Sequence, residues 1–193
     1  FHDSIAECGS FSETTANAMP RAYRSLLAHE NHMTVTVEAF HNSPVDVVVL
    51  GKRVTETHYA RKILLTRRSD GRVVQYGIMR VALSHLPETV RQEIESETIP
   101  LGRVLIEHNV LRQVELVSLW RIAVHGELAD RLEMSEGETT YGRTALIHVG
   151  GEPAVELLEI VTPFVAEVAR LRAYRARLPN SGELGYNRRP NQT

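Results

Sequence analysis

Arg61 is a candidate functional residue, because its charged side chain lies in an otherwise apolar strand segment. It lies in the segment HYARKILLT, where strand alternation puts Arg61 on the same face as Ile63 and Leu65. The guanidinium is therefore expected to point inward, and it needs an anionic partner because an unpaired buried charge is costly. Two interpretations stand: a structural salt bridge to a neighbouring strand, or a fork of donors for the carboxylate of a bound molecule.

Glu159 has the same character near the other end of the chain. In PAVELLEIVTP, Glu159 alternates with Leu157 and Val161, so its carboxylate is expected in apolar surroundings. An enclosed carboxylate is a candidate acid, base or hydroxyl acceptor. Alternatively, Glu159 simply pairs with Arg61 or with Arg143. Arg143 lies among apolar residues in TTYGRTALI and has the same two interpretations as Arg61.

Other motifs give weaker signals. The PLGR turn at residues 100–103 enters a helix-like stretch whose exposed N–H groups could bind an anion. The nucleotide-binding patterns GxxxxGK[ST] and GxGxxG and the GxSxG elbow are missing from the sequence. Nine histidines are scattered without ligand spacing, so no metal is expected, although His29 and His32 could share one side of a helix end.

Composition limits the function further. The chain has 193 residues, which suits one domain, and its net charge of -2 provides no general field for nucleic acid or a membrane surface. No apolar run approaches the roughly 18 residues that span a bilayer. Cys8 is the only cysteine, which excludes an internal disulfide and fits a cytoplasmic setting.

The elements that must position these residues are mostly strands. A loose leader is expected over residues 1–19, with a weak helix an alternative there, and a short helix follows from Pro20. The alternation in MTVTVEAFH predicts a strand, and residues 34–84 then form an antiparallel meander with a tight turn at Asp70-Gly71. Helices are predicted in LPETVRQEIESET and PLGRVLIEHN.

The second half returns to strands. LRQVELVSLWRIAV is a predicted strand in which Val114 and Leu116 face opposite to Val117 and Leu119. A short helix, HGELADRLEM, precedes two strands joined across residues 150–152. An amphipathic helix ends the domain of residues 20–178, and residues 179–193 form a disordered tail. The fold class is α+β with a mostly antiparallel sheet.

Residues from about 20 to 164 resemble the chorismate lyase (chorismate pyruvate-lyase) family. The matching pieces follow the order of the family: MTVTVE (33–38), ARKILL (60–65), PLGRVL (100–105), YGR with GGEP (141–143 and 150–153), and ELLEIVTP (156–163). This resemblance implies an antiparallel sheet with a ligand sealed beneath helical flaps. It also implies that chorismate loses pyruvate and becomes 4-hydroxybenzoate, with no metal or organic cofactor.

The resemblance assigns roles as well. Arg61 would hold the ring carboxylate with the backbone N–H of Leu101, and Glu159 would handle a proton beside the ring oxygen. Because aromatisation drives this reaction, orientation and exclusion of water would be most of what the protein supplies. The predicted site thus has Glu159 and Arg61 as catalytic residues, and Arg61, Leu101, Met33, Gly77 and Arg143 as residues that bind the substrate.

A second resemblance gives the alternative. Residues 129–163 are similar to the effector-binding domain of GntR-type repressors (the UTRA domain), which shares the lyase fold but binds ligands without reaction. Only 32 residues precede Met33, and they are not basic, so no DNA-binding winged helix is expected. The alternative is thus a stand-alone ligand-binding domain, or a relative acting on another carboxylated ring in secondary metabolism. In either case the expected partner is an aromatic or cyclohexadienyl carboxylate, and the oligomeric state is left open.

Overall fold

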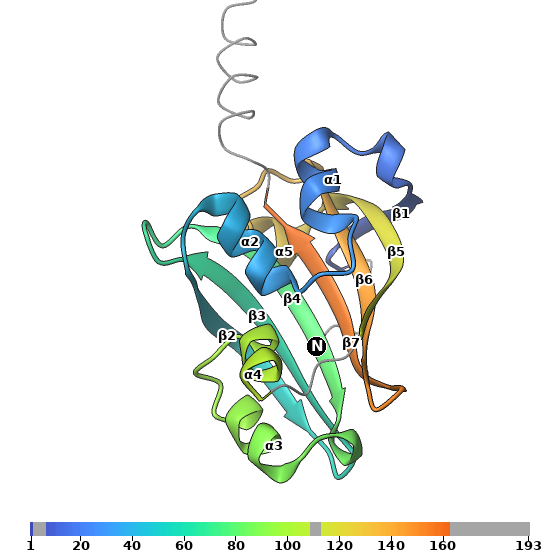
Figure 1. The fold of residues 1–193 in the computed structure, drawn as a ribbon. Coiled ribbons are helices and arrows are strands. Elements are labelled where there is room, and N and C mark those ends of the chain that lie inside the picture. The colour runs from blue at the N-terminus through green and yellow to red at the C-terminus, as the bar shows by residue number, and fades with distance from the viewer. Residues whose placement is uncertain (2–6, 109–112, 163–193) are drawn as a thin grey trace, which may run out of the picture. The chain divides into compact units, whose positions relative to one another are not determined.

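One antiparallel sheet organises the chain (Figure 1). The computed structural model describes residue 1, residues 7–108 and residues 113–162. Seven strands hydrogen-bond in the order β1-β5-β6-β7-β4-β3-β2. Their bounds are β1 (Gly9–Thr14), β2 (Val45–Val54), β3 (His58–Arg67), β4 (Val73–Ala82), β5 (Gln113–Val124), β6 (Thr139–Val149) and β7 (Glu152–Val161). The predicted α+β class with an antiparallel sheet is confirmed.

Two groups of hairpins build this sheet. Strands β2, β3 and β4 form the predicted meander, and the Asp70-Gly71 turn joins β3 to β4 with Gly71 at a φ of 71°. Such a positive φ costs a glycine little, because it has no Cβ. Strands β5, β6 and β7 form the second meander, and β7 then pairs with β4 at the centre of the sheet.

Helices cover both faces of the sheet unequally. Helices α1, α2, α3 and α4 lie over one face, and α5 lies behind the other (Figure 1). Their bounds are α1 (Arg21–Leu27), α2 (Met33–His41), α3 (Glu88–Glu95), α4 (Leu101–Glu107) and α5 (Gly126–Arg131), with short 3-10 turns at Ala16–Ala18 and Leu83–His85. The predicted helices at α1, α3, α4 and α5 are confirmed.

The apolar side chains form three clusters that follow this division. One cluster packs the face of β3, β4, β6 and β7 against α3 and α4, and a second packs the same face against α1 and α2. The third fills the opposite face beneath α5. On that side Lys62 of β3 pairs with Glu127 of α5 at 2.7 Å, which ties the helix to the sheet.

The predicted strand MTVTVEAFH is wrong, because this segment is helix α2. Its alternating Val and Thr residues fit a strand locally, but Met33, Thr34 and Val37 are buried together, as positions i, i+1 and i+4 of a helix are. Asn42 ends the helix at a φ of 48°, the left-handed conformation that asparagine tolerates. Packing on the sheet therefore outweighs the weak strand preference of these β-branched residues.

The leader also differs from expectation. Residues 9–14 form strand β1, which pairs with β5 along its whole length, from Gly9 opposite Val124 to Thr14 opposite Leu119. Hydrogen bonds to an edge strand thus order a polar segment that has little apolar surface of its own. The predicted C-terminal helix after residue 163 and the tail at 179–193 lie outside the described residues.

Strand β5 departs from simple alternation. Its pairing with β6 is irregular between Leu116 and Ser118, as at a β-bulge, and Val117 is 52% exposed there. As a result Leu116 and Leu119, predicted on opposite faces, both pack into the cluster under α1 and α2. Over the described residues, no helix is both long and apolar enough to cross a bilayer. The cytoplasmic setting stays a prediction.

Candidate functional site

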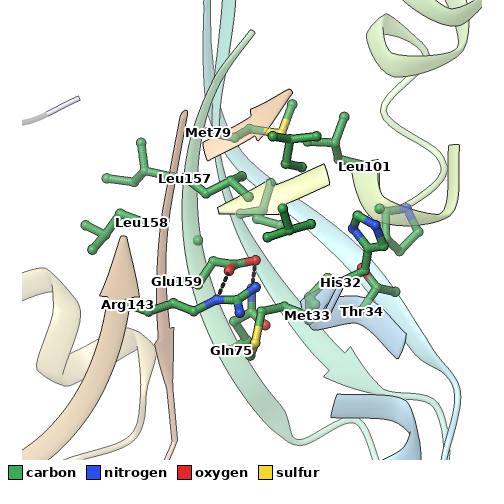
Figure 2. A pocket seen from close by; sticks show the side chains of 18 residues that line it. His32, Met33, Thr34, Gln75, Met79, Leu101, Arg143, Leu157, Leu158 and Glu159 are labelled. Carbon is green, nitrogen blue, oxygen red and sulfur yellow. Dashed lines mark hydrogen bonds and ion pairs between the residues drawn. The ribbon is translucent and has the colours of Figure 1, made fainter. Parts of the chain in front are cut away.

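A cavity lies between the sheet and the first turns of α2 and α4 (Figure 2). It is on the face of the sheet that α1 to α4 cover, where the cluster under α1 and α2 meets the cluster under α3 and α4. Its volume is about 40 Å³, which is room for a few water molecules or part of a small ligand. The lining residues come from α2, α4 and the strands β3 to β7: His32, Met33, Thr34, Ile63, Leu65, Gln75, Gly77, Ile78, Met79, Pro100, Leu101, Gly102, Val114, Arg143, Ile147, Leu157, Leu158 and Glu159.

An ion pair forms the polar end of the cavity. Arg143 on β6 and Glu159 on β7 are cross-strand partners, and the Arg143 Nε donates to Glu159 Oε2 at 2.7 Å. Both are buried, at 1% and 7% exposure. Each therefore offsets the other's charge in a region from which water is largely excluded. The interpretation of Glu159 as the partner of Arg143 is confirmed.

The other two nitrogens of the Arg143 guanidinium are also engaged. Its Nη1 donates to the carbonyl of His29 at 2.8 Å, and its Nη2 donates to the carbonyl of Asn31 at 3.1 Å. Both carbonyls belong to the connection between α1 and α2. Arg143 thus fixes that connection on the sheet, which places the start of α2 over the cavity.

His29 completes this arrangement as a neutral imidazole. Its Nε2 lies 2.7 Å from the carbonyl of Leu26, and its Nδ1 accepts the N–H of Asn31 at 3.1 Å. Burial lowers the pKa of His29, and the guanidinium of Arg143 lowers it further. The same two causes lower the pKa of His32 at the mouth of the cavity. Because both ring nitrogens of His29 already have partners, His29 has no nitrogen left to bind a metal together with His32, the possibility raised by the sequence.

Gln75 on β4 lies beside the ion pair. Its Nε2 is 3.5 Å from Glu159 Oε1, at the limit of a hydrogen bond, and the side chain is 3% exposed (Figure 2). Among the described residues, Gln75 Oε1 has no hydrogen-bond partner. Buried amide oxygens are rarely left in this state, so the polar end of the cavity has an unmet acceptor.

The first turns of α2 and α4 close the cavity over the sheet. They approach so closely that a Cβ on Gly102 would lie 2.9 Å from the Thr34 Oγ1, so glycine is the residue that fits there. Arg103 of α4 also pairs with Glu38 of α2, which in turn accepts the N–H of Val45. The PLGR turn therefore serves helix-to-helix packing directly above the cavity.

Arg61 lies next to the cavity and is not among the residues that line it. Its Nη1 and Nη2 lie 3.4 and 3.3 Å from the carbonyls of Ile94 and Ile99, between α3 and α4. The side chain is fully buried, its Nε has no partner among the described residues, and burial lowers its pKa. Arg61 therefore holds the connection that leads into α4. Its role toward a ligand carboxylate stays a prediction.

The other predicted site residues line the cavity. Met33 and Leu101 are the first residues of α2 and α4, and both are buried. Gly77 lies opposite Glu159 on the neighbouring strand, and a Cβ there would lie 3.2 Å from Ile63. Their predicted contacts with a substrate, and the catalytic role of Glu159, stay predictions.

Sequence reasoning missed Gln75, His32 and Thr34 as cavity residues. Gln75 had a usable signal, since it alternates with Gly77 and Met79 in an apolar strand, as Arg61 and Glu159 do in theirs. Thr34 had none, because its segment was predicted as a strand, and His32 was considered only as a metal ligand with His29. Among the described residues, no group of three or more His, Cys, Asp or Glu side chains is placed to hold a metal ion.

Comparison with known proteins supports the fold of this chain through similar structures and finds no match in sequence. No protein-family model matches the chain, and no curated protein matches it in sequence. The effector domain of PhnF from Mycobacterium smegmatis is similar in structure, with a TM-score of 0.55 and 9% identity, over 68% of this chain and 88% of that one. A structure of PhnF from the same organism has a TM-score of 0.54 and 9% identity, over 68% of this chain and 64% of that one.

A third similar structure is the ligand-binding domain of a putative GntR-family transcriptional regulator from Bordetella bronchiseptica. Its TM-score is 0.48 at 14% identity, over 61% of this chain and 85% of that one. The chain therefore has the antiparallel α+β fold of such effector domains, the fold that the two sequence resemblances predicted. It spans just under two thirds of the PhnF structure, and none of the three structures is a chorismate lyase.

Proposed function

We propose that this chain is a small-molecule-binding domain of the effector-domain type, and that its ligand is a carboxylated ring enclosed between the sheet and helices α2 and α4. The observation that carries the proposal is the cavity beside two buried polar atoms, Gln75 Oε1 and Arg61 Nε, that lack partners among the described residues. Buried polar groups of this kind are expected to be paired in the state that a protein uses. The fold it shares with the effector domain of PhnF supports the same assignment.

The lining agrees with a ring as the ligand body. Away from its polar end the cavity is walled by apolar side chains, among them Ile63, Met79, Leu101 and Leu157. Most ligand pockets combine such an apolar wall with a few fixed polar groups. Met79 is the cross-strand neighbour of Arg61, four residues from Gln75 along β4, so the backbone positions that carry the two unmet groups are roughly 13 Å apart along the strand.

The proposal assigns the carboxylate to the Arg61 end. The Arg143 guanidinium has each of its nitrogens engaged by protein groups. Arg61 makes two long hydrogen bonds to carbonyls, has Tyr59 beside it and Glu97 near it, and keeps an unpartnered Nε with no carboxylate of the described residues in salt-bridge contact. A guanidinium that is buried without a carboxylate partner favours an anion. The expected absence of nucleic-acid binding stays a prediction.

Binding measurements with a matched variant test this function. We expect benzoate to bind and the Arg61→Met variant to weaken benzoate at least tenfold more than it weakens toluene, by calorimetry and NMR titration. The control is Arg80→Met, which removes an exposed arginine of the adjacent strand that pairs with Glu156. Equal losses for benzoate and toluene would exclude Arg61 as the carboxylate anchor. No binding of either ring at millimolar concentration would overturn the proposal.

Pyruvate elimination from chorismate is the second candidate function. The observation in its favour is Glu159, a buried carboxylate at the wall of the cavity, where it could accept a proton as the ether bond breaks. Incubation with chorismate, followed by assays for pyruvate and 4-hydroxybenzoate, tests it directly. Release of both products in equal amounts, lost in Glu159→Gln, would establish the lyase. Release of neither would leave ligand binding alone.

A further inference from the structure

The amide of Gln75 has a fixed orientation at the polar end of the cavity. Its Nε2 faces Glu159 Oε1 at 3.5 Å, and the reversed amide would set two acceptor oxygens against each other. The carbonyl oxygen of Gln75 is therefore the atom left without a partner in the described part of the chain. Because it shares one carbon with Nε2, it lies no more than about 6 Å from Glu159 Oε1.

This end of the cavity offers acceptors, and every nitrogen of the Arg143 guanidinium already donates to an acceptor of the protein. Arg143 directs its donors to Glu159, His29 and Asn31. Glu159 has two oxygens with about four acceptor sites, and one strong donor, the Arg143 Nε, uses one of them. A ligand that enters here therefore meets two neighbouring acceptors, Gln75 Oε1 and the Glu159 carboxylate.

We propose that Gln75 and Glu159 form a two-acceptor subsite for a ligand group that carries two donor hydrogens, such as an uncharged primary amino group on the ring. One hydrogen bonds to Glu159 and the other to Gln75 Oε1. The group is uncharged because Arg143 already offsets the charge of Glu159, and an additional buried cation would have no counter-ion. This inference rests on the proposed ring-binding function and names the group at the end opposite the carboxylate.

The subsite predicts how one variant changes three ligands of equal shape. Gln75→Met keeps the length of the side chain and removes the acceptor, and Gln92→Met is the matched control on the exposed face of α3. The ligands are toluene, phenol and aniline. The methyl group of toluene donates no hydrogen bond, and the hydroxyl of phenol donates one, to the stronger acceptor Glu159. The amino group of aniline donates two, one to Glu159 and one to Gln75 Oε1. Gln75→Met should weaken aniline about threefold to tenfold, the value of one net hydrogen bond, and change phenol and toluene less than twofold.

The same comparison with 4-methyl-, 4-hydroxy- and 4-aminobenzoate repeats the test on carboxylated rings. Equal changes for all three substituents, or no change for the amino compounds, would overturn the subsite while the ring-binding function stands. If no ring binds, the ring-binding function fails. The subsite is then tested by the melting temperature of Gln75→Met compared with that of the wild-type protein, both without ligand. Gln75→Met should then melt at or above the wild-type temperature, because an unpaired acceptor has been removed. A lower melting temperature would mean that the amide of Gln75 stabilises the free protein more than its unpaired Oε1 costs, and would overturn the inference.

Discussion

Arg143 and Glu159 face each other across β6 and β7, with the Arg143 Nε donating to Glu159 Oε2 at 2.7 Å in almost complete burial. The sequence left open whether each residue anchors a ligand or whether the two pair with each other. Because they pair with each other, their charges cancel, and neither residue needs a charged group of a ligand as its partner.

Removing one member of this pair is therefore expected to destabilise the fold strongly. Arg143→Met or Glu159→Gln should each lower the free energy of unfolding by about 3–5 kcal/mol, because each leaves a buried group unpaired. The double variant should lose less than the sum of the two single losses. Urea denaturation measures all three. Additive losses would mean that the two side chains act independently in solution.

The close approach of α2 and α4 gives a second prediction. Gly102→Ala places a Cβ against Thr34 Oγ1 and should destabilise the fold by about 1–2 kcal/mol, since the strain exceeds the better helix propensity of alanine. Thr34→Ala removes the clashing hydroxyl. Gly102→Ala should therefore cost less in the Thr34→Ala background than in the wild type. An equal cost in both backgrounds would place the strain elsewhere.

Arg61 should control the connection between α3 and α4 independently of any ligand. Arg61→Met leaves the carbonyls of Ile94 and Ile99 without their donor. Amide hydrogen exchange should then accelerate in residues 94–107 and stay unchanged in β5 to β7. Uniform acceleration across the sheet would instead indicate a loss of global stability.

The stability of the protein should depend on pH through His29. Burial and the neighbouring Arg143 lower its pKa from the ordinary 6.5, so the unfolded chain binds a proton that the folded chain does not. The free energy of unfolding should therefore be constant above pH 7 and fall as the pH drops below 6.5. The pKa of His32 is lowered by the same two causes, so His29→Gln should reduce this slope without abolishing it, whereas His85→Gln, at an exposed turn, should leave it unchanged. A slope as steep in His29→Gln as in the wild type would assign it to other groups.

The sequence predicted the sheet well because its pairing depends on local signals. The Asp70-Gly71 turn and the alternation in β3 and β4 define their hairpin directly, whereas the pairing of β4 with β7 joins distant segments. It failed at α2, where Val and Thr residues favour a strand locally and packing against Gly102 and the sheet decides otherwise. It failed at β1 because a polar strand is ordered by the edge that it joins.

The candidate site was predicted in part for similar reasons. Glu159 and Arg61 were recognised as inward-facing charges, and both are buried. Which of them lines the cavity depends on where α3 and α4 lie, and sequence periodicity carries no such information. The bonds from Arg143 to the carbonyls of the α1–α2 connection join residues more than 110 positions apart, and no local pattern encodes them.

Those bonds have a thermodynamic consequence. Arg143 joins Glu159, at the wall of the cavity, to residues 29 and 31, at the edge of the helical cover, so the conformation of that cover and the occupancy of the cavity share one network. Linkage requires that such coupling be reciprocal. Suppose that a ligand bonded to Glu159 stabilises the α1–α2 connection by some factor. Any other binding event that destabilises this connection must then weaken the affinity for the ligand by the same factor.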